Sequence, residues 1–125
     1  MRTKILIVDD EPDVCNAISS YFGKRGYDVI AAASAKVAMI EFLVERPALI
    51  LMDIRMPETD GLECLRMIRR VDFEVPIIML TALTDEDTAK RALESGATDY
   101  ITKPLSLAAI ETAITLYLFL HSVKQ

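Results

Sequence analysis

Three aspartates occupy positions from which they could meet at one site. Asp9 and Asp10 directly follow the apolar run at residues 5–8, and Asp53 directly follows the apolar run at residues 49–52. Short apolar runs of this kind are typical of buried parallel strands. If the two strands are neighbours, three carboxylates meet at one end of a sheet, where like charges cannot all stay ionised without a partner. The arrangement therefore demands a proton, a lysine or a divalent cation.

Thr81 and Lys103 are expected at the same edge, because Thr81 ends a later predicted strand and Lys103 follows the last one. A hard divalent cation such as Mg²⁺ prefers oxygen ligands, so one or two carboxylates and a backbone carbonyl would suit it. With the cation and the lysine ammonium in place, the site would favour a tetrahedral anion. Asp53 could then attack phosphorus and form an aspartyl phosphate, while the cation and Lys103 neutralise charge on the transferred group.

Apolar runs and amphipathic segments alternate along the whole chain and supply the elements that position these residues. Strands are predicted over residues 4–8, 27–32, 48–53, 76–81 and 98–101. Helices are predicted over residues 12–24, 35–45, 62–70, 85–95 and 106–124. Pro12 suits the first turn of its helix, and Ser34 can cap the second helix. The residues of the second helix expected to face inward are Val37, Met39, Ile40 and Leu43.

Five repeated strand–helix units predict an α/β fold, in which a five-stranded parallel sheet carries helices on both faces. Right-handed crossovers allow few strand orders. For the flavodoxin-like, doubly wound order 2-1-3-4-5, the ligand site lies beyond the carboxyl ends of the first and third strands. Asp9, Asp10 and Asp53 end those two strands. The fold and the charges therefore indicate the same site, within one domain over residues 1–125.

The composition excludes several classes of protein. A chain that is 52% apolar and 26% charged is typical of a soluble globular domain, and its net charge of −5 argues against direct binding of nucleic acid. No secretory signal or membrane-spanning run is present, and Cys15 and Cys64 are expected to be reduced thiols of a cytoplasmic protein. His121, near the end of the last helix, is expected to be solvated rather than a catalytic base.

Four motifs occur in this order at the predicted strand ends: Val8-Asp9-Asp10, the stretch Asp53-Ile54-Arg55-Met56-Pro57 with Asp60-Gly61, Thr81-Ala82, and Lys103-Pro104. In these motifs, and over essentially all 125 residues, the chain resembles the CheY-like receiver domains of two-component response regulators. Thr59 and Ala48 depart from residues that are common in that family, but neither belongs to the proposed chemistry.

The resemblance implies a role for each residue of the site. Asp53 would accept a phosphoryl group from a histidine kinase or a histidine phosphotransfer protein. Asp10 and Asp53 would bind Mg²⁺, for which Mn²⁺ could substitute, together with the backbone carbonyl of Arg55, and Asp9 would help through water. Thr81 would hydrogen-bond the phosphoryl oxygens, and Lys103 would pair with them. The domain would catalyse only its own phosphorylation and dephosphorylation, and would not be an enzyme toward other substrates.

The resemblance also implies how phosphorylation becomes a signal. Tyr100 matches an aromatic switch residue, which turns inward when Thr81 moves toward the phosphate. The face formed by the fourth helix, the fifth strand and the last helix would then control an output domain or a partner, with transcription regulation as the expected output. The bond between Lys103 and Pro104 would be cis. We expect bulky Leu83 to hinder attacking water and so lengthen the phosphorylated lifetime.

Other interpretations stay open for these residues. Asp9 or Asp10 could cap the helix that follows, and Tyr100 could be an ordinary half-exposed aromatic on an edge strand. An aspartyl-phosphate phosphatase of the haloacid dehalogenase type would use a similar nucleophile and metal. Such an enzyme needs a second aspartate two residues after the nucleophile, where this chain has Arg55. A third alternative is a degenerate receiver that never becomes phosphorylated.

The last predicted helix is apolar on two faces. Ile110, Ile114 and Tyr117 or Leu118 suffice to pack on the sheet, and a second stripe is left over, formed by Leu116, Phe119, Leu120 and Val123. A helix with two apolar faces favours a second partner, either a homodimer through this helix or a domain that follows it. With Met1 directly before the first strand, we expect a stand-alone receiver acting through protein contacts, or the N-terminal domain of a longer regulator.

Overall fold

The computed structural model describes residues 2–56, 60–82 and 84–123. The strands are β1 (Thr3–Val8), β2 (Tyr27–Ala32), β3 (Leu49–Asp53), β4 (Ile77–Thr81) and β5 (Asp99–Thr102). The helices are α1 (Pro12–Gly23), α2 (Ala35–Glu45), α3 (Gly61–Val71), α4 (Glu86–Glu94) and α5 (Leu107–Val123). No end differs from its predicted position by more than one residue. Predictions that involve Met1, Pro57, Thr59, Leu83 and Lys124 lie outside the described residues.

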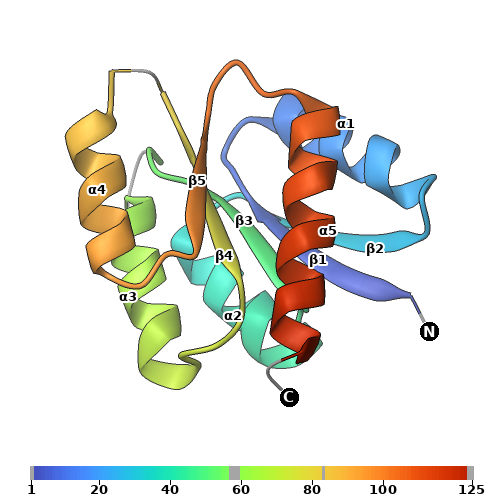
Figure 1. Ribbon diagram of the computed structural model, residues 1–125, viewed down its shortest axis with the longest axis horizontal. Coiled ribbons are helices and arrows are strands. Elements are labelled where there is room, and N and C mark those ends of the chain that lie inside the picture. The colour runs from blue at the N-terminus through green and yellow to red at the C-terminus, as the bar shows by residue number, and fades with distance from the viewer. Residues whose placement is uncertain (1, 57–59, 83, 124–125) are drawn as a thin grey trace.

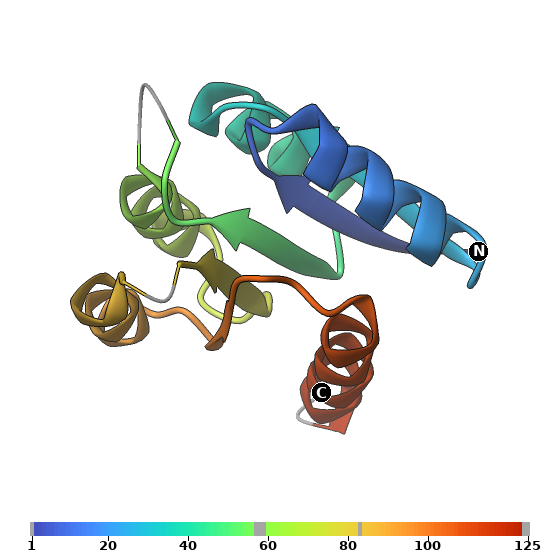
Figure 2. The same ribbon diagram turned by 90° about the horizontal axis from the view of Figure 1, so that it is seen from above.

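All five strands are parallel and form one sheet in the order β2-β1-β3-β4-β5 (Figure 1), as predicted. Helices α1 and α5 cover one face of the sheet, and α2, α3 and α4 cover the other (Figure 2). The strand order reverses between β1 and β3, because the chain leaves β1 toward one edge and later returns to its other side. In sheets of this kind, ligands bind beyond the carboxyl ends of the two strands at such a point, here β1 and β3.

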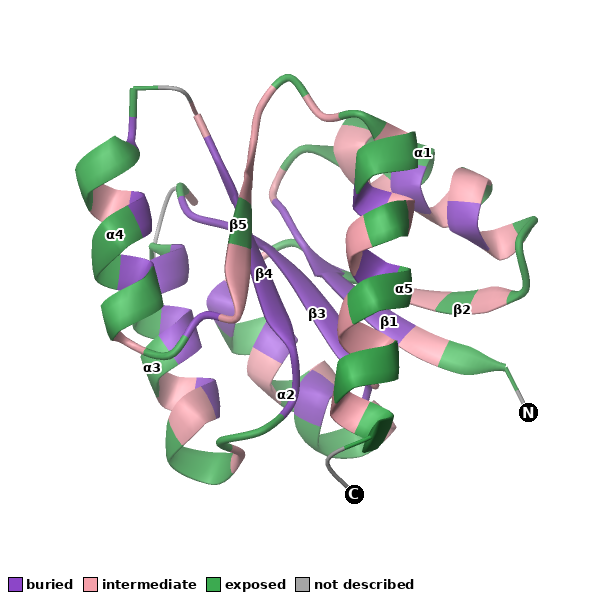
Figure 3. Ribbon diagram, in the orientation of Figure 1, coloured by how far each residue is buried: buried purple, intermediate pink, exposed green. Residues whose placement is uncertain are grey.

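Alternation along the strands builds two separate cores, one on each face of the sheet. In β1, for example, Ile5 and Ile7 face α1 and α5, whereas Leu6 and Val8 face α2 and α3. Every residue of the central strands β3 and β4 is buried (Figure 3). A strand that is buried on both faces is apolar at consecutive positions, which explains the continuous apolar runs that precede Asp53 and Thr81.

Helix α2 packs on the sheet with a different face from the one predicted. Its buried residues are Ala35, Ala38 and Phe42, with Met39 packed against them. Val37, Ile40 and Leu43 are exposed, so the prediction was wrong for these three residues and right for Met39. The two alanines let the helix backbone approach the sheet closely, and Phe42 fills the space beyond them. Ser34 caps the helix as predicted, accepting a hydrogen bond from the amide of Val37.

Helix α5 packs with the predicted face inward. Ile110 and Ile114 are buried, and Tyr117 and Leu118 pack at the edge of the same core. The second stripe is exposed, and we call it the α5 stripe: Leu116, Phe119, Leu120 and Val123. Within the described ranges, no helix combines the length and the apolar character needed to cross a membrane.

Candidate functional site

The carboxyl ends of β1 and β3 bring the three predicted aspartates together. Val8 lies level with Met52 in the parallel register, so the residues that follow both strands emerge side by side. One carboxylate oxygen from each of Asp9, Asp10 and Asp53 lies within 4.8 Å of the other two. Three carboxylates at this separation cannot all stay ionised without a positive charge or a proton among them.

Asp9 is the most deeply buried of the three. One of its oxygens accepts a hydrogen bond from the amide of Glu11 (2.9 Å), and the other, Oδ2, has no hydrogen-bond partner among the described residues. Burial, with a smaller contribution from the nearby Asp53 charge, raises the pKa of Asp9 to about 6. A buried carboxylate oxygen without a donor is costly, so the site fits a cation that binds directly or through water.

Asp53 lies at the centre of the site and is only 5% exposed. Its Oδ1 accepts a hydrogen bond from the amide of Arg55 (3.3 Å) and lies 3.4 Å from the Lys103 ammonium. Burial raises the pKa of Asp53, while Lys103 opposes that shift. The other oxygen of Asp53 is thus left for a cation or an electrophile, with a positive charge already beside the carboxylate.

Thr81 ends β4 next to the aspartates, and its hydroxyl donates a hydrogen bond to the carbonyl of Ala82 (3.2 Å). That same carbonyl accepts the amide of Asp85 (3.0 Å), which closes a turn before α4. The carbonyl of Thr81 accepts the amide of Lys103 (2.7 Å). Thr81, Lys103 and Asp53 are therefore brought together, as the sequence predicted.

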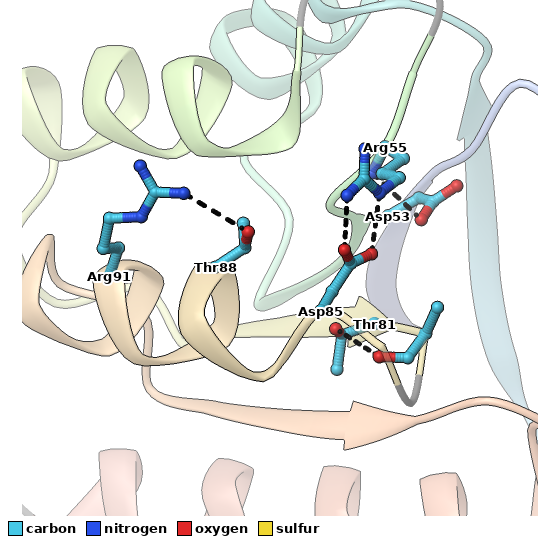
Figure 4. A network of polar contacts seen from close by, with 7 residues as sticks. Asp53, Arg55, Thr81, Asp85, Thr88 and Arg91 are labelled. Carbon is cyan, nitrogen blue, oxygen red and sulfur yellow. Dashed lines mark hydrogen bonds and ion pairs between the residues drawn. The ribbon is translucent and has the colours of Figure 1, made fainter.

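The sequence did not reveal an ion pair between Arg55 and Asp85 (Figure 4). The Arg55 guanidinium binds both carboxylate oxygens of Asp85, one from Nε at 2.8 Å and the other from Nη2. Asp85 is buried, and Arg55 lowers its pKa. Because Asp85 is the first residue of a predicted helix, its type is explained by its place at the helix N-terminus, and no pattern links position 85 to position 55.

Gly61 allows α3 to begin directly against the carboxyl end of β3. A Cβ atom at this position would overlap the carbonyl oxygen of Asp53 and lie 2.9 Å from the Cα of Ile54. The amide of Gly61 donates to the carbonyl of Ile54 (2.6 Å), and the preceding Asp60 caps α3 through the amide of Glu63 (2.8 Å). The motif Asp60-Gly61 thus fixes the backbone that follows Asp53.

The comparisons with known proteins agree with this geometry. The family model described as "Response regulator receiver domain" matches residues 5–115. The chain belongs to this family. As a receiver domain, it is similar to full-length regulators and to isolated domains, and the curated relatives are regulatory proteins.

Two curated relatives show the extent of the likeness. The chain is 38% identical to the regulatory protein AtoC of Escherichia coli over 98% of its own length and 26% of that protein. It is 40% identical to the alkaline phosphatase synthesis transcriptional regulatory protein PhoP of Bacillus subtilis over 85% of its own length and 44% of that protein. The receiver domain thus spans less than half the length of these relatives.

Two solved structures match the fold closely. A response regulator receiver domain protein from Clostridium thermocellum has a TM-score of 0.93 at 26% identity, covering 98% of this chain and 99% of that one. NtrX from Brucella abortus has a TM-score of 0.93 at 28% identity, covering 99% of this chain and 28% of that one. Both matches agree with the α/β architecture and with the resemblance stated from the motifs.

The remaining predicted features of the receiver domain lie around the same edge. The bond between Lys103 and Pro104 is cis, as expected. Tyr100 lies on the edge strand β5 and is 37% exposed, outside the aspartate site, so its switching role stays a prediction. Asp9 bonds to the amide of Glu11, the residue at the N-cap of α1, and not to the first helical turn. It is therefore not a cap of that helix.

Proposed function

We propose that the chain is the phosphoacceptor of a two-component signalling system, with Asp53 as the phosphorylated residue. The observation that carries this proposal is the position of Asp53, which is buried beside Lys103 and within reach of two further carboxylates. A carboxylate oxygen of Asp53 forms a bond to phosphorus as the nitrogen–phosphorus bond of a phosphohistidine donor breaks. The donor is a histidine kinase or a histidine phosphotransfer protein.

The acidic cluster fits Mg²⁺, for which Mn²⁺ could substitute. Asp10, Asp53 and the backbone carbonyl of Arg55 would hold the ion, and the unpartnered oxygen of Asp9 would reach it through water. When bound, the ion neutralises negative charge on the transferred phosphoryl group. Lys103, which lies 3.4 Å from Asp53 Oδ1, would supply a second positive charge and can pair with a phosphoryl oxygen.

Thr81 would respond to phosphorylation by changing its hydrogen-bond acceptor. Its hydroxyl, which donates to Ala82 in the structure, would donate to a phosphoryl oxygen instead, and the backbone at the start of α4 would follow. Tyr100 would turn inward as this loop moves. A change of this kind requires only that the phosphoryl group prefer one arrangement by a few kcal/mol. The α4–β5–α5 face then presents a different surface to its partner.

We further propose that this domain works in the cytoplasm, and that a partner or an attached output domain controls transcription. The relatives AtoC and PhoP support this, since their names describe a regulatory protein and a transcriptional regulatory protein. A stand-alone receiver that acts through protein contacts is the alternative. The α5 stripe is the proposed surface for a homodimer.

Labelling with a small phosphodonor tests the assignment of Asp53. Wild-type protein incubated with acetyl phosphate and Mg²⁺ should gain one phosphoryl group by mass spectrometry, and Asp53→Asn should gain none. Asp28→Asn, at an exposed position on β2, is the matched control and should label normally. Labelling of Asp53→Asn at the wild-type level would refute the assignment.

A phosphatase of the haloacid dehalogenase type is disfavoured by Arg55. The position two residues after Asp53 must supply an acid in such an enzyme, and here it carries a guanidinium bound to Asp85. We expect no sustained hydrolysis of p-nitrophenyl phosphate by the wild-type chain. Steady turnover that Asp53→Asn abolishes would restore the phosphatase alternative.

A further inference from the structure

The side chain of Arg55 is directed away from the carboxylate that its own backbone contacts. Its amide donates to Asp53, yet its guanidinium binds Asp85 at the start of α4 (Figure 4). The Arg55 side chain is 74% exposed, whereas that of Asp85 is 4% exposed. The buried carboxylate of Asp85 is thus paired with an exposed side chain, whose backbone lies two residues after Asp53.

Asp85 occupies the N-cap position of α4 but makes no side-chain capping bond. An aspartate at this position normally accepts an amide from the first turn of its helix. Here both of its oxygens are bound by Arg55. The ion pair therefore replaces the cap, and α4 begins without the hydrogen bond that its sequence provides.

The carbonyl of Ala82 connects this ion pair to Thr81. It accepts the amide of Asp85 and the hydroxyl of Thr81, so one carbonyl links the start of α4 to the last residue of β4. Holding Asp85 in place keeps this carbonyl beside the Thr81 hydroxyl. Displacing Asp85 would move the carbonyl and release the hydroxyl.

We propose that Arg55 and Asp85 are positioning residues that hold Thr81 in its resting orientation, and that a phosphoryl group on Asp53 competes with Asp85 for the Arg55 guanidinium. The proposal rests on the proposed function, because it needs Asp53 to be the phosphorylated residue. A phosphoryl group carries more negative charge than a carboxylate and offers guanidinium a bidentate partner. Asp85, once released, is free to cap α4, which stabilises the new arrangement.

The first test removes the charge of Asp85 while keeping its shape. We expect Asp85→Asn, without phosphodonor, to move the amide NMR signals of the β4–α4 segment toward those of wild type saturated with beryllium trifluoride. It should also label with acetyl phosphate about fivefold faster, since coupling between sites of this kind is typically fivefold or more. Asp87→Asn, an exposed acid on the first turn of α4, is the matched control and should behave as wild type. Resting signals of Asp85→Asn that coincide with those of wild type would overturn the proposal.

The second test replaces Arg55, the exposed partner, so that no buried side chain is substituted. Arg55→Gln should move the same resting signals as Asp85→Asn, and the double variant should move them no further than either single variant. Arg55→Gln should also respond less to beryllium trifluoride, because it lacks the guanidinium that the anion attracts. Additive shifts in the double variant would show that the two residues act independently, which contradicts the proposal.

The two tests separate failure of this inference from failure of the proposed function. If wild type neither labels nor responds to beryllium trifluoride, Asp53 is not a phosphoacceptor and the proposed function fails. The resting-state spectra of Asp85→Asn, Arg55→Gln and their double variant still report whether the ion pair holds the β4–α4 segment. Normal labelling together with unchanged resting spectra would reject the ion pair alone.

Discussion

Asp9 shows how a single buried carboxylate couples the site to the stability of the fold. Its native pKa of about 6 exceeds its ordinary value of 3.8, so the native state prefers the protonated form. The stabilisation from Asp9 is therefore fully present below pH 3.8 and is lost as the pH rises through about 6. Without a cation, an ionised Asp9 destabilises the native protein at neutral pH.

We predict that Asp9→Asn is more stable than wild type at pH 7.5 in the presence of a chelator. A shift of about two pKa units corresponds to at most about 3 kcal/mol of unfolding free energy. The advantage should shrink as the pH falls below 6 and be nearly gone at about pH 3, where the wild-type carboxyl is mostly protonated in both states. Urea denaturation at both pH values measures it, and a stability difference that does not change with pH would contradict the prediction.

Gly61 matters for the site although it has no functional group. We predict that Gly61→Ala lowers the free energy of unfolding by more than about 1 kcal/mol, because the added Cβ would overlap the carbonyl of Asp53. Labelling by acetyl phosphate should slow as well, since the carboxylate of Asp53 is displaced together with its backbone. Gly23→Ala, where a Cβ meets nothing within 4 Å, is the control. Equal effects of the two substitutions would refute the steric argument.

For individual residues of the site, the sequence predicted which side chains lie together, but not every contact between them. Asp9, Asp10, Asp53, Thr81 and Lys103 could be placed because each lies at the end of a strand whose neighbours follow from topology. The pair of Arg55 and Asp85 could not, because both residues are in loops, where side-chain direction depends on the local backbone. Types and spacing therefore predict a site on strand ends more reliably than one on loops.

Individual helices differ in how well their sequence predicts their packing. Helix α3 has a polar face, and Leu62, Leu65 and Ile68 on its apolar face are buried. Helix α2 is apolar nearly all round, so its sequence contains little information on which stripe faces the sheet. The face that packs on the sheet contains Ala38 and Phe42, because their small and large side chains fit the sheet surface.

The α5 stripe leads to a prediction about association. We expect sedimentation to show a dimer of wild-type protein with beryllium trifluoride, and Phe119→Ser to weaken that dimer about tenfold or more, as loss of an aromatic anchor does. Phe119 is 62% exposed on the outer face of α5. Val44→Ser, on the exposed face of α2, is the control and should leave association unchanged. A wild-type chain that stays monomeric with and without the anion would contradict the prediction.

The acidic cluster exists only when β1 and β3 are paired, so a cation that binds there would be coupled to the folding of the whole molecule. We predict that Mg²⁺ raises the midpoint of thermal unfolding. At about 100 times its dissociation constant, the ion should add about 2.7 kcal/mol of unfolding free energy. Asp53→Asn, which removes one ligand charge, should reduce this increase. An unchanged midpoint over a full Mg²⁺ titration at pH 7.5 would contradict the assignment of the metal site.

Strand order also has a consequence for the chain as it leaves the ribosome. Strand β3 pairs with β1 on one side and with β4 on the other, and all of its residues are buried in the finished fold. A nascent chain that has emerged only as far as α3 can pair β2, β1 and β3, but the far edge of β3 stays uncovered. An apolar, unpaired strand edge is a template for association with other chains. Nascent chains that stall between α3 and β4 are therefore those that most need protection by chaperones.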